Sequence, residues 1–277
     1  MSSAEKLLAH PGALCNMVRR VAIDAGRITL DYFEMVRPEQ VERKSNGSPV
    51  TEADRAAEDF IVAALKDIIP EIPVIAEESA DAGNIPDLSQ HDYFWLVDPL
   101  DATREFIAGG KNYTVNIGLI CKGVPVLGVV YAPALGVLYA GHGEGTAVRW
   151  SEDTGKDKSI TVRKTPAAGL TVMSSFYNAD DTRMDKFLQA FKVEKILKRA
   201  SSIKLCLVAE GKADMHPRLG TTCEWDTAAG EAVLRAAGGI LTNLEGEPLS
   251  YGGVGKKFIN PHFVASAFEW RDMGEEA

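Results

Sequence analysis

The stretch "YFWLVDPLDATREF" (residues 93–106) decides the fold, because its apolar run predicts a buried strand that ends in two aspartates, Asp98 and Asp101. Pro99 lies between them, and its fixed φ turns the chain at once, so both carboxylates can project to the same side. Two desolvated carboxylates repel each other, and a divalent cation between them removes that repulsion. Oxygen ligands with no nearby histidine or thiolate favour Mg²⁺, Mn²⁺ or Ca²⁺ over zinc.

The residues just after this pair point to a phosphate. If a short helix opens after Asp101, the backbone N–H groups of Ala102 and Thr103 lie at its positive end, where they can bind an anion. Metal-binding carboxylates beside a phosphate cradle predict a phosphoryl-transfer site.

Outward from this stretch, the spacing of apolar residues predicts other elements of the first half. Amphipathic helices are expected over 13–33 and 51–69, and the second begins with a capping box made by Thr51 and Asp54. Short strands with tight turns over 113–149 predict an antiparallel meander.

The second half is expected to alternate strands and helices. The polar segment 151–159 is expected to be an exposed loop. Beyond Thr165 the pattern is α/β, and it includes an alanine-rich helix that begins at Asp226 and stops at a glycine pair. We therefore expect an α+β domain over 1–160 and an α/β domain over 161–277, with a soft boundary within 150–166.

The acidic candidates all lie at the ends of predicted elements, where α/β folds build sites. Asp54 and Asp226 open helices, and Glu77 ends the short strand predicted in "IPVIAEES". Each has a plainer alternative: Asp54 and Asp226 can be simple helix caps, and Glu77 a solvated strand end.

Composition narrows the possible partners. The 277-residue chain has a net charge of −9 and no basic stripe, which argues against a nucleic-acid polymer. A small phosphorylated ligand remains compatible with this charge if metal cations lie between it and the carboxylates. The cysteines form no C-x-x-C pair, and no apolar run reaches about 18 residues. We expect a cytoplasmic protein without a transmembrane segment; the oligomeric state stays open.

The motifs resemble those of one family. "WLVDPLDATREF" is similar to the W-x-x-D-P-[IL]-D-G-T-x-x-F signature of the inositol monophosphatase superfamily, and "EWDTAAGEAVLRAAGG" to its W-D-x-A-A-G signature. "SPVTEADRAAE" and "VIAEES" resemble its two upstream segments, and all four occur in family order over residues 44–240. The resemblance implies a layered αβαβα sandwich and a Mg²⁺-dependent phosphomonoesterase with two or three ions per site.

The resemblance also assigns roles. It implies that the metal ligands are four carboxylates and one main-chain carbonyl, which belong to Glu77, Asp98, Leu100 (carbonyl), Asp101 and Asp226. Asp54, with Thr51 as its partner, would help to hold a further metal or its water. The Thr103 hydroxyl and Glu77 would orient the attacking water.

Within the superfamily, "SSIKLCLVAEGKAD" and "HPRLGTTCEWDTAAG" look most similar to the CysQ-type 3′(2′),5′-bisphosphate nucleotidases. These remove the 3′-phosphate of adenosine 3′,5′-bisphosphate, a by-product of sulfate assimilation. The resemblance then places three residues at the 5′-phosphate and nucleotide end: Ser201, Lys204 and Arg218. Taken alone, the side chains of Lys204 and Arg218 would suggest ordinary surface charges. The resemblance also implies lithium sensitivity and leaves open loose attachment to the inner face of a membrane.

The sequence departs from the family pattern in several places. The signature glycine is Ala102; we expect it to have ordinary helix-start dihedrals, so that only a methyl group is added. Ala76 also replaces a glycine, with little expected effect. The segment "MSSFYNADDTR" lacks the usual nucleotide-contacting residues, which bears on substrate preference. His216 could contact the base or be a plain buried histidine.

Two other functions remain to be distinguished. An inositol-1-monophosphatase or another sugar phosphatase would share the metal chemistry, but its singly phosphorylated substrate needs no second anion clamp. A catalytically silent metal- or nucleotide-binding regulator would be expected to lack a ligand carboxylate or the threonine, and none is missing.

Overall fold

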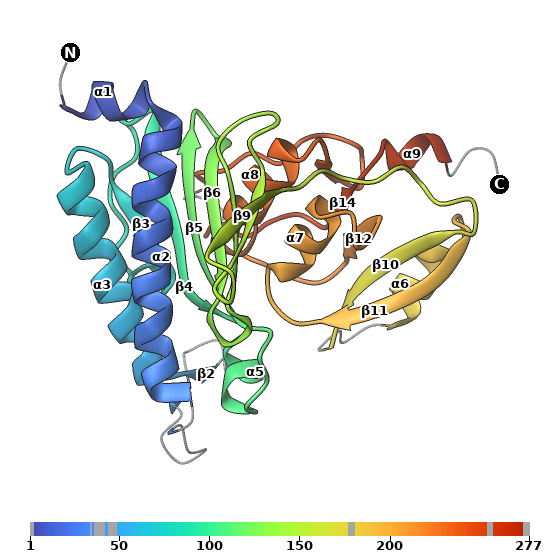
Figure 1. The fold of residues 1–277 in the computed structure, drawn as a ribbon, viewed down its shortest axis with the longest axis horizontal. Helices are drawn as coiled ribbons and strands as arrows, with labels where there is room; N and C mark the ends of the chain where they lie inside the picture. The colour runs from blue at the N-terminus through green and yellow to red at the C-terminus, as the bar shows by residue number, and fades with distance from the viewer. Residues whose placement is uncertain are drawn as a thin grey trace.

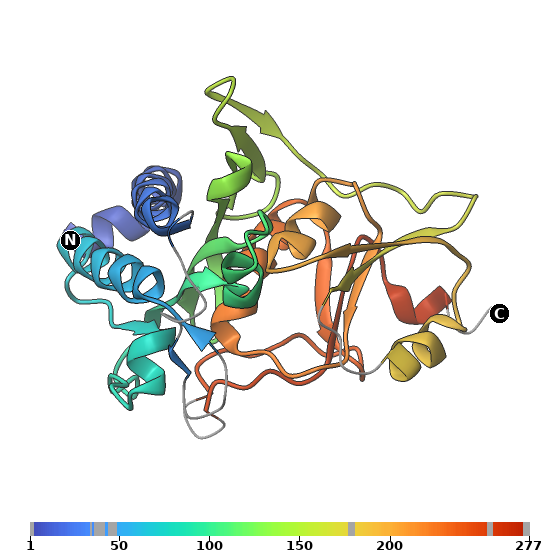
Figure 2. The ribbon, with the colours of Figure 1, turned by 90° about the horizontal axis from the view of Figure 1, so that it is seen from below.

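The computed structural model describes residues 3–33, 35, 42–43, 49–176, 181–253 and 257–273. Five layers follow one another across the molecule: helices, sheet, helices, sheet, helices (Figure 1). This is the αβαβα sandwich expected from the sequence. The outer helical layers lie at opposite ends of the molecule (Figure 2).

Helices make up the outer and middle layers. The first outer layer contains α2 (Pro11–Phe33) and α3 (Glu52–Ile68), preceded by α1 (Ser3–Leu8). The middle layer contains α7 (Ile203–Ala209) and α8 (Glu224–Ala236). The last layer and the connections contain the remaining helices: α4 (Glu77–Asp81), α5 (Thr103–Ile107), η2 (Pro133–Leu135), α6 (Asp181–Leu188) and α9 (Trp270–Met273).

The first sheet has seven strands in sequence order. Its strands are β3 (Val74–Ala76), β4 (Tyr93–Asp101), β5 (Thr114–Cys121), β6 (Val124–Ala132), β7 (Val137–Gly141), β8 (Val148–Ser151) and β9 (Lys156–Ser159). Only β3 and β4 run parallel; the other neighbours are antiparallel, as the short turns predicted.

The second sheet has five strands in the order β11-β10-β12-β14-β13. Its strands are β10 (Leu170–Ser175), β11 (Val193–Arg199), β12 (Met215–Arg218), β13 (Ile240–Asn243) and β14 (Phe263–Ser266). β10 runs parallel to β11 and β12, whereas β14 is antiparallel to both of its neighbours. A separate two-stranded sheet pairs β1 (Glu42–Arg43) with β2 (Pro49–Val50).

Glycines on three adjacent strands let α8 lie close against the first sheet. A Cβ at Gly128 would stand 2.1 Å from the Ala229 carbonyl oxygen, and one at Gly141 would stand 2.7 Å from the Ala236 Cβ. Gly118 likewise faces the backbone of Ala229. Any side chain at Gly128 or Gly141 would push the helix away, so these glycines fix the position of α8 and of Asp226 in its first turn.

Two expectations about local structure are wrong. Residues 156–159 form β9, an edge strand paired with β8, where we expected a loop. All four side chains are exposed, so no apolar alternation marked the strand. The strand before Glu77 ends at Ala76, and Glu77 begins α4.

The domain division at 160/161 stays a prediction. The two sheets lie on either side of it, but α8 from the second half packs on the first sheet. Most of the connection between the first two long helices, 34–48, lies outside the described residues. No helix in the described ranges is both long and apolar enough to cross a membrane.

Candidate active site

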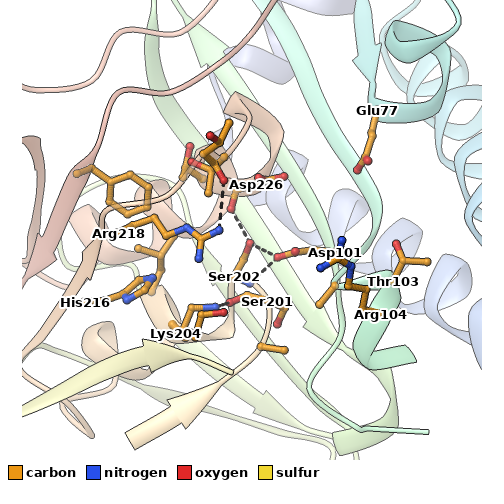
Figure 3. A pocket seen from close by; sticks show the side chains of 18 residues that line it. Glu77, Asp101, Thr103, Arg104, Ser201, Ser202, Lys204, His216, Arg218 and Asp226 are labelled. Atoms are coloured by element: carbon orange, nitrogen blue, oxygen red, sulfur yellow. Dashed lines mark hydrogen bonds between the residues drawn. The ribbon is translucent and has the colours of Figure 1, made fainter. Parts of the chain in front are cut away.

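A cavity of about 380 Å³ lies where β4 and α5 of the first half meet α7, α8 and β12 of the second. Figure 3 shows an acidic end with Glu77 and Asp101, beside which Arg104 also lies, and a basic end with Lys204 and Arg218. Asp226 lies between them. Ligand cavities in proteins have volumes of about 300–1,000 Å³, so this one has room for a small molecule.

Three of the predicted ligand carboxylates come together at the acidic end. One oxygen from each of Glu77, Asp98 and Asp226 lies within 4.8 Å of the others. Burial, followed by the negative charges of Asp101 and Glu77, raises the pKa of Asp226 well above its usual range. Such a cluster is unfavourable when fully ionised unless cations balance it, and its oxygen-only donor set fits hard divalent cations such as Mg²⁺. The described residues can therefore hold a metal ion.

Asp101 lines the cavity but is not one of these three. Its Oδ2 accepts a hydrogen bond from the Ser202 amide at 2.5 Å and lies 2.6 Å from the Ser202 Oγ. The Asn116 Nδ2 donates to the same Ser202 Oγ at 3.0 Å. Asp101 is thus held against α7 of the second half, and its role as a metal ligand stays a prediction.

A bulge explains how β4 presents both aspartates. Asp98 pairs with Asn116 and Asp101 pairs with Thr114, so three steps along β4 correspond to two along β5. The extra residue breaks the alternation that would otherwise send residues three apart to opposite faces. The Leu100 amide donates to Asp98 Oδ1 at 3.0 Å, across Pro99 within the bulge. The predicted turn at Pro99 is wrong, because β4 continues through Pro99 to Asp101 and the irregularity is a bulge within the strand. The predicted carbonyl ligand at Leu100 is untested.

Asp54 and Asp226 both cap helices, but only Asp226 lines the cavity, whereas Asp54 contacts it through Thr103. Asp54 Oδ2 accepts from the Thr51 amide and hydroxyl at 2.7 and 2.6 Å, which is the predicted capping box. Its other oxygen, Oδ1, accepts from the Thr103 hydroxyl at 3.2 Å. Asp226 Oδ2 caps α8 by accepting from the Cys223 amide at 2.8 Å. The capping role and the site role are therefore compatible for both residues.

Glu58 is a positioning residue that the sequence analysis missed. Its side chain accepts hydrogen bonds from the Glu78 amide at 2.7 Å and from the Ser79 amide at 2.8 Å. These amides lie in the first turn of α4, so Glu58 anchors the short helix that carries Glu77. The available signal was the spacing of Glu58 four residues after Asp54, on the same helix face.

Ala102 has a backbone conformation that we did not expect. Its φ of 74° and ψ of 52° place it in the left-handed region, so the expectation of ordinary helix-start dihedrals is wrong. The chain reverses here from the bulged end of β4 into α5, and the Ala102 carbonyl accepts from the Glu105 and Phe106 amides. An L-residue in this region is strained by about 1–2 kcal/mol. Ser201, on the opposite wall of the cavity, also has a positive φ, of 53°.

Lys204 is buried and is not the surface charge that its type alone would suggest. It is only 6% exposed, and its Nζ donates to the Ser201 carbonyl. Burial lowers the pKa of Lys204 to about 8, although Asp101 acts in the opposite direction. Arg218 lines the cavity beside it and donates to the Thr221 carbonyl at 3.2 Å. The structure thus brings the predicted residues Ser201, Lys204 and Arg218 together.

His216 is buried and also lines the cavity. Residues 177–180, within the departure "MSSFYNADDTR", lie outside the described residues. Ser175, just before them, lines the cavity.

Comparisons with known proteins agree on one family. A model described as the inositol monophosphatase family matches residues 13–272. The protein named 3′(2′),5′-bisphosphate nucleotidase CysQ in Escherichia coli is 40% identical over 256 residues, which cover 92% of this chain and 100% of that protein. The protein of the same name in Salmonella typhimurium is 41% identical with the same coverage. Among solved structures, CysQ from Bacteroides thetaiotaomicron has a TM-score of 0.76 and 33% identity, and the match covers 92% of this chain and 98% of that one.

Proposed function

Because this chain belongs to the inositol monophosphatase family, we propose that it is a Mg²⁺-dependent phosphomonoesterase that removes the 3′-phosphate of adenosine 3′,5′-bisphosphate. The products are adenosine 5′-monophosphate and phosphate. The relatives of about 40% identity carry the name of this activity and match almost the whole chain.

The two-ended cavity is the observation that supports this substrate. The acidic end can hold cations and, through them, the phosphate that reacts. Lys204 and Arg218 at the other end supply donors for a second phosphate. A substrate with a single phosphate would leave these donors at the basic end without a phosphate to bind.

Divalent cations, when bound by Glu77, Asp98 and Asp226 with Asp101 as a further ligand, supply Lewis-acid chemistry that acidifies water and balances charge on the phosphate. The protein's task at this end is to place carboxylate oxygens close together and keep them there. The cap of α8 does this for Asp226, because one oxygen is fixed by the Cys223 amide. Glu58 holds Glu77 in place indirectly, because it accepts a hydrogen bond from the first turn of α4, the helix that begins with Glu77.

Thr103 would orient the attacking water. Its hydroxyl donates to Asp54 Oδ1, which fixes the hydrogen and leaves the oxygen lone pairs able to accept from a water. The second Asp54 oxygen is occupied by Thr51, so the carboxylate cannot rotate freely. Asp54 therefore acts on the water through Thr103.

At the far end, Lys204 and Arg218 would bind the 5′-phosphate. Arg218 offers a planar fork of donors and Lys204 a point charge. Ser201 lies next to both, with its carbonyl held by the Lys204 ammonium. The cytoplasmic location and a loose attachment to the inner face of a membrane stay predictions from the sequence.

The test is phosphate release from adenosine 3′,5′-bisphosphate and from inositol 1-phosphate, each with Mg²⁺ and with a chelator. We expect faster turnover of the nucleotide, and none with the chelator. Equal or faster turnover of inositol 1-phosphate would favour the inositol phosphatase instead. No Mg²⁺-dependent turnover of either compound would favour a catalytically silent binding protein.

A further inference from the structure

One face of β12 forms part of the cavity wall at the basic end. His216 and Arg218 are two residues apart on this strand, so their side chains point to the same face, and both line the cavity. Phe263 of β14 lies opposite Arg218 in the strand register and also lines it. Figure 3 shows the His216 ring beside Lys204 and Arg218, away from Glu77.

The hydrogen bond made by His216 fixes its tautomer. Its Nδ1 lies 3.0 Å from the Met173 carbonyl oxygen. A carbonyl can only accept, so Nδ1 carries the hydrogen. Burial and the positive charges of Lys204 and Arg218 lower the pKa of His216 well below its usual range, so the ring is neutral. The other nitrogen, Nε2, is therefore a hydrogen-bond acceptor.

That acceptor has no protein donor in the part of the chain that the structure describes. His216 is 3% exposed, and its ring forms a T-shaped pair with Phe263 at a centroid distance of 6.0 Å and an interplanar angle of 87°. Lys204 directs its ammonium to the Ser201 carbonyl. In the open cavity water can donate to Nε2. A ligand that displaces this water must bring a donor of its own, because otherwise Nε2 is left covered and unsatisfied.

We propose that His216 is a specificity-determining residue whose Nε2 accepts a hydrogen bond from an N–H or O–H group on the nucleoside part of the substrate. This rests on the proposed function. A phosphate dianion is excluded as the partner because its oxygens are acceptors too, and the donors it needs are supplied by Lys204 and Arg218. Two groups of a nucleoside carry suitable donors: the exocyclic amine of adenine and the 2′-hydroxyl of ribose.

The consequence is discrimination against substrates that lack the donor. Binding such an analogue leaves Nε2 buried and unsatisfied, which corresponds to a loss of about 10- to 100-fold in kcat/KM. The loss should appear mainly in KM, because His216 is remote from the acidic end where the phosphate ester is cleaved.

The test compares three substrates in the full-length enzyme with Mg²⁺: the 3′,5′-bisphosphates of adenosine, purine riboside and 2′-deoxyadenosine. Purine riboside has a hydrogen in place of the amine, and the deoxy compound lacks the hydroxyl. We expect wild-type kcat/KM to fall about tenfold or more for one of these two analogues, and the affected analogue identifies the donor. Equal values for all three substrates would overturn the proposal.

The His216→Phe variant tests the role of the acceptor itself, because it keeps an aromatic ring in the same place but has no hydrogen-bond acceptor. It should reduce kcat/KM for the adenosine compound and abolish the discrimination, while the turnover of inositol 1-phosphate changes little. His216→Gln, which retains an acceptor oxygen, should restore part of the discrimination. Unchanged substrate ratios in His216→Phe would overturn the proposal even if the wild type discriminates. If wild-type enzyme releases phosphate from inositol 1-phosphate but from no nucleotide, the proposed function itself fails, and the role of His216 with it.

Discussion

Replacing Ala102 with glycine should stabilise the protein. Ala102 has a φ of 74° and a ψ of 52°. An alanine in this region is strained by about 1–2 kcal/mol, and glycine is not. Glycine also gives the unfolded chain more freedom, which offsets about 0.4–1 kcal/mol of the gain. The net increase in the free energy of unfolding should lie within about 0–1.6 kcal/mol, with a central value of about 0.8 kcal/mol, which corresponds to roughly 2–3 °C in melting temperature for a chain of this size.

Ala108, which follows the last residue of α5 as its C-cap, provides the matched control. It is exposed at the other end of α5 with a φ of −77°, which alanine adopts without strain. Ala108→Gly should therefore lower the free energy of unfolding by about 0.4–1 kcal/mol. Urea unfolding of the two variants beside wild type measures both changes under the same conditions. If Ala102→Gly destabilises the protein as much as Ala108→Gly does, Ala102 is not in the left-handed region and the reasoning is refuted.

Three further predictions concern buried and clustered charges. Asp214 is fully buried and accepts hydrogen bonds from Arg163 at 2.7 and 2.6 Å. The substitution Asp214→Ala should therefore lower the free energy of unfolding, measured with urea, by about 3 kcal/mol or more. A decrease below about 1 kcal/mol would contradict this. Burial raises the pKa of Glu231 to about 7, so the folded state keeps a proton that the unfolded state releases above about pH 4.5. Between about pH 5 and pH 8, the free energy of unfolding of wild type should therefore fall by roughly 2–3 kcal/mol relative to that of Glu231→Gln. Parallel pH profiles of the two proteins would disprove this. Mg²⁺ should raise the melting temperature of wild type, because the acidic cluster exists only in the folded state, and Asp226→Asn should reduce that increase; an equal increase in both would place the cation elsewhere.

Local patterns in the sequence predicted much of the fold and part of the site. The capping box of Thr51 and Asp54 depends on residues three apart, and the structure confirms it. The antiparallel meander from β5 to β8 follows from connections of two to six residues. These features need no information from distant parts of the chain.

Features that depend on distant contacts could not be predicted in this way. The Asp101 carboxylate lies against Ser202, about a hundred positions later in the chain, and no spacing rule connects the two. β9 is a strand because β8 offers it an edge, since its own residues are all exposed. The burial of Lys204 likewise results from packing of α7 between the two sheets, so residue type alone suggested a surface charge.

Ala102 illustrates a third limit. The family signature has glycine at this position, and glycine is the residue that adopts a positive φ without strain. The choice between ordinary and left-handed dihedrals depended on how the bulged end of β4 meets α5, and only the structure provides that geometry.

The identity of the nucleotide product tests the central claim most directly. With Mg²⁺ present, adenosine 3′,5′-bisphosphate is incubated with the enzyme, and the products are separated by anion-exchange chromatography. The account predicts adenosine 5′-monophosphate and phosphate in equal amounts, because Lys204 and Arg218 hold the 5′-phosphate while the 3′-phosphate lies at the acidic cluster. Adenosine 3′-monophosphate as the main product, or no Mg²⁺-dependent product at all, would contradict it.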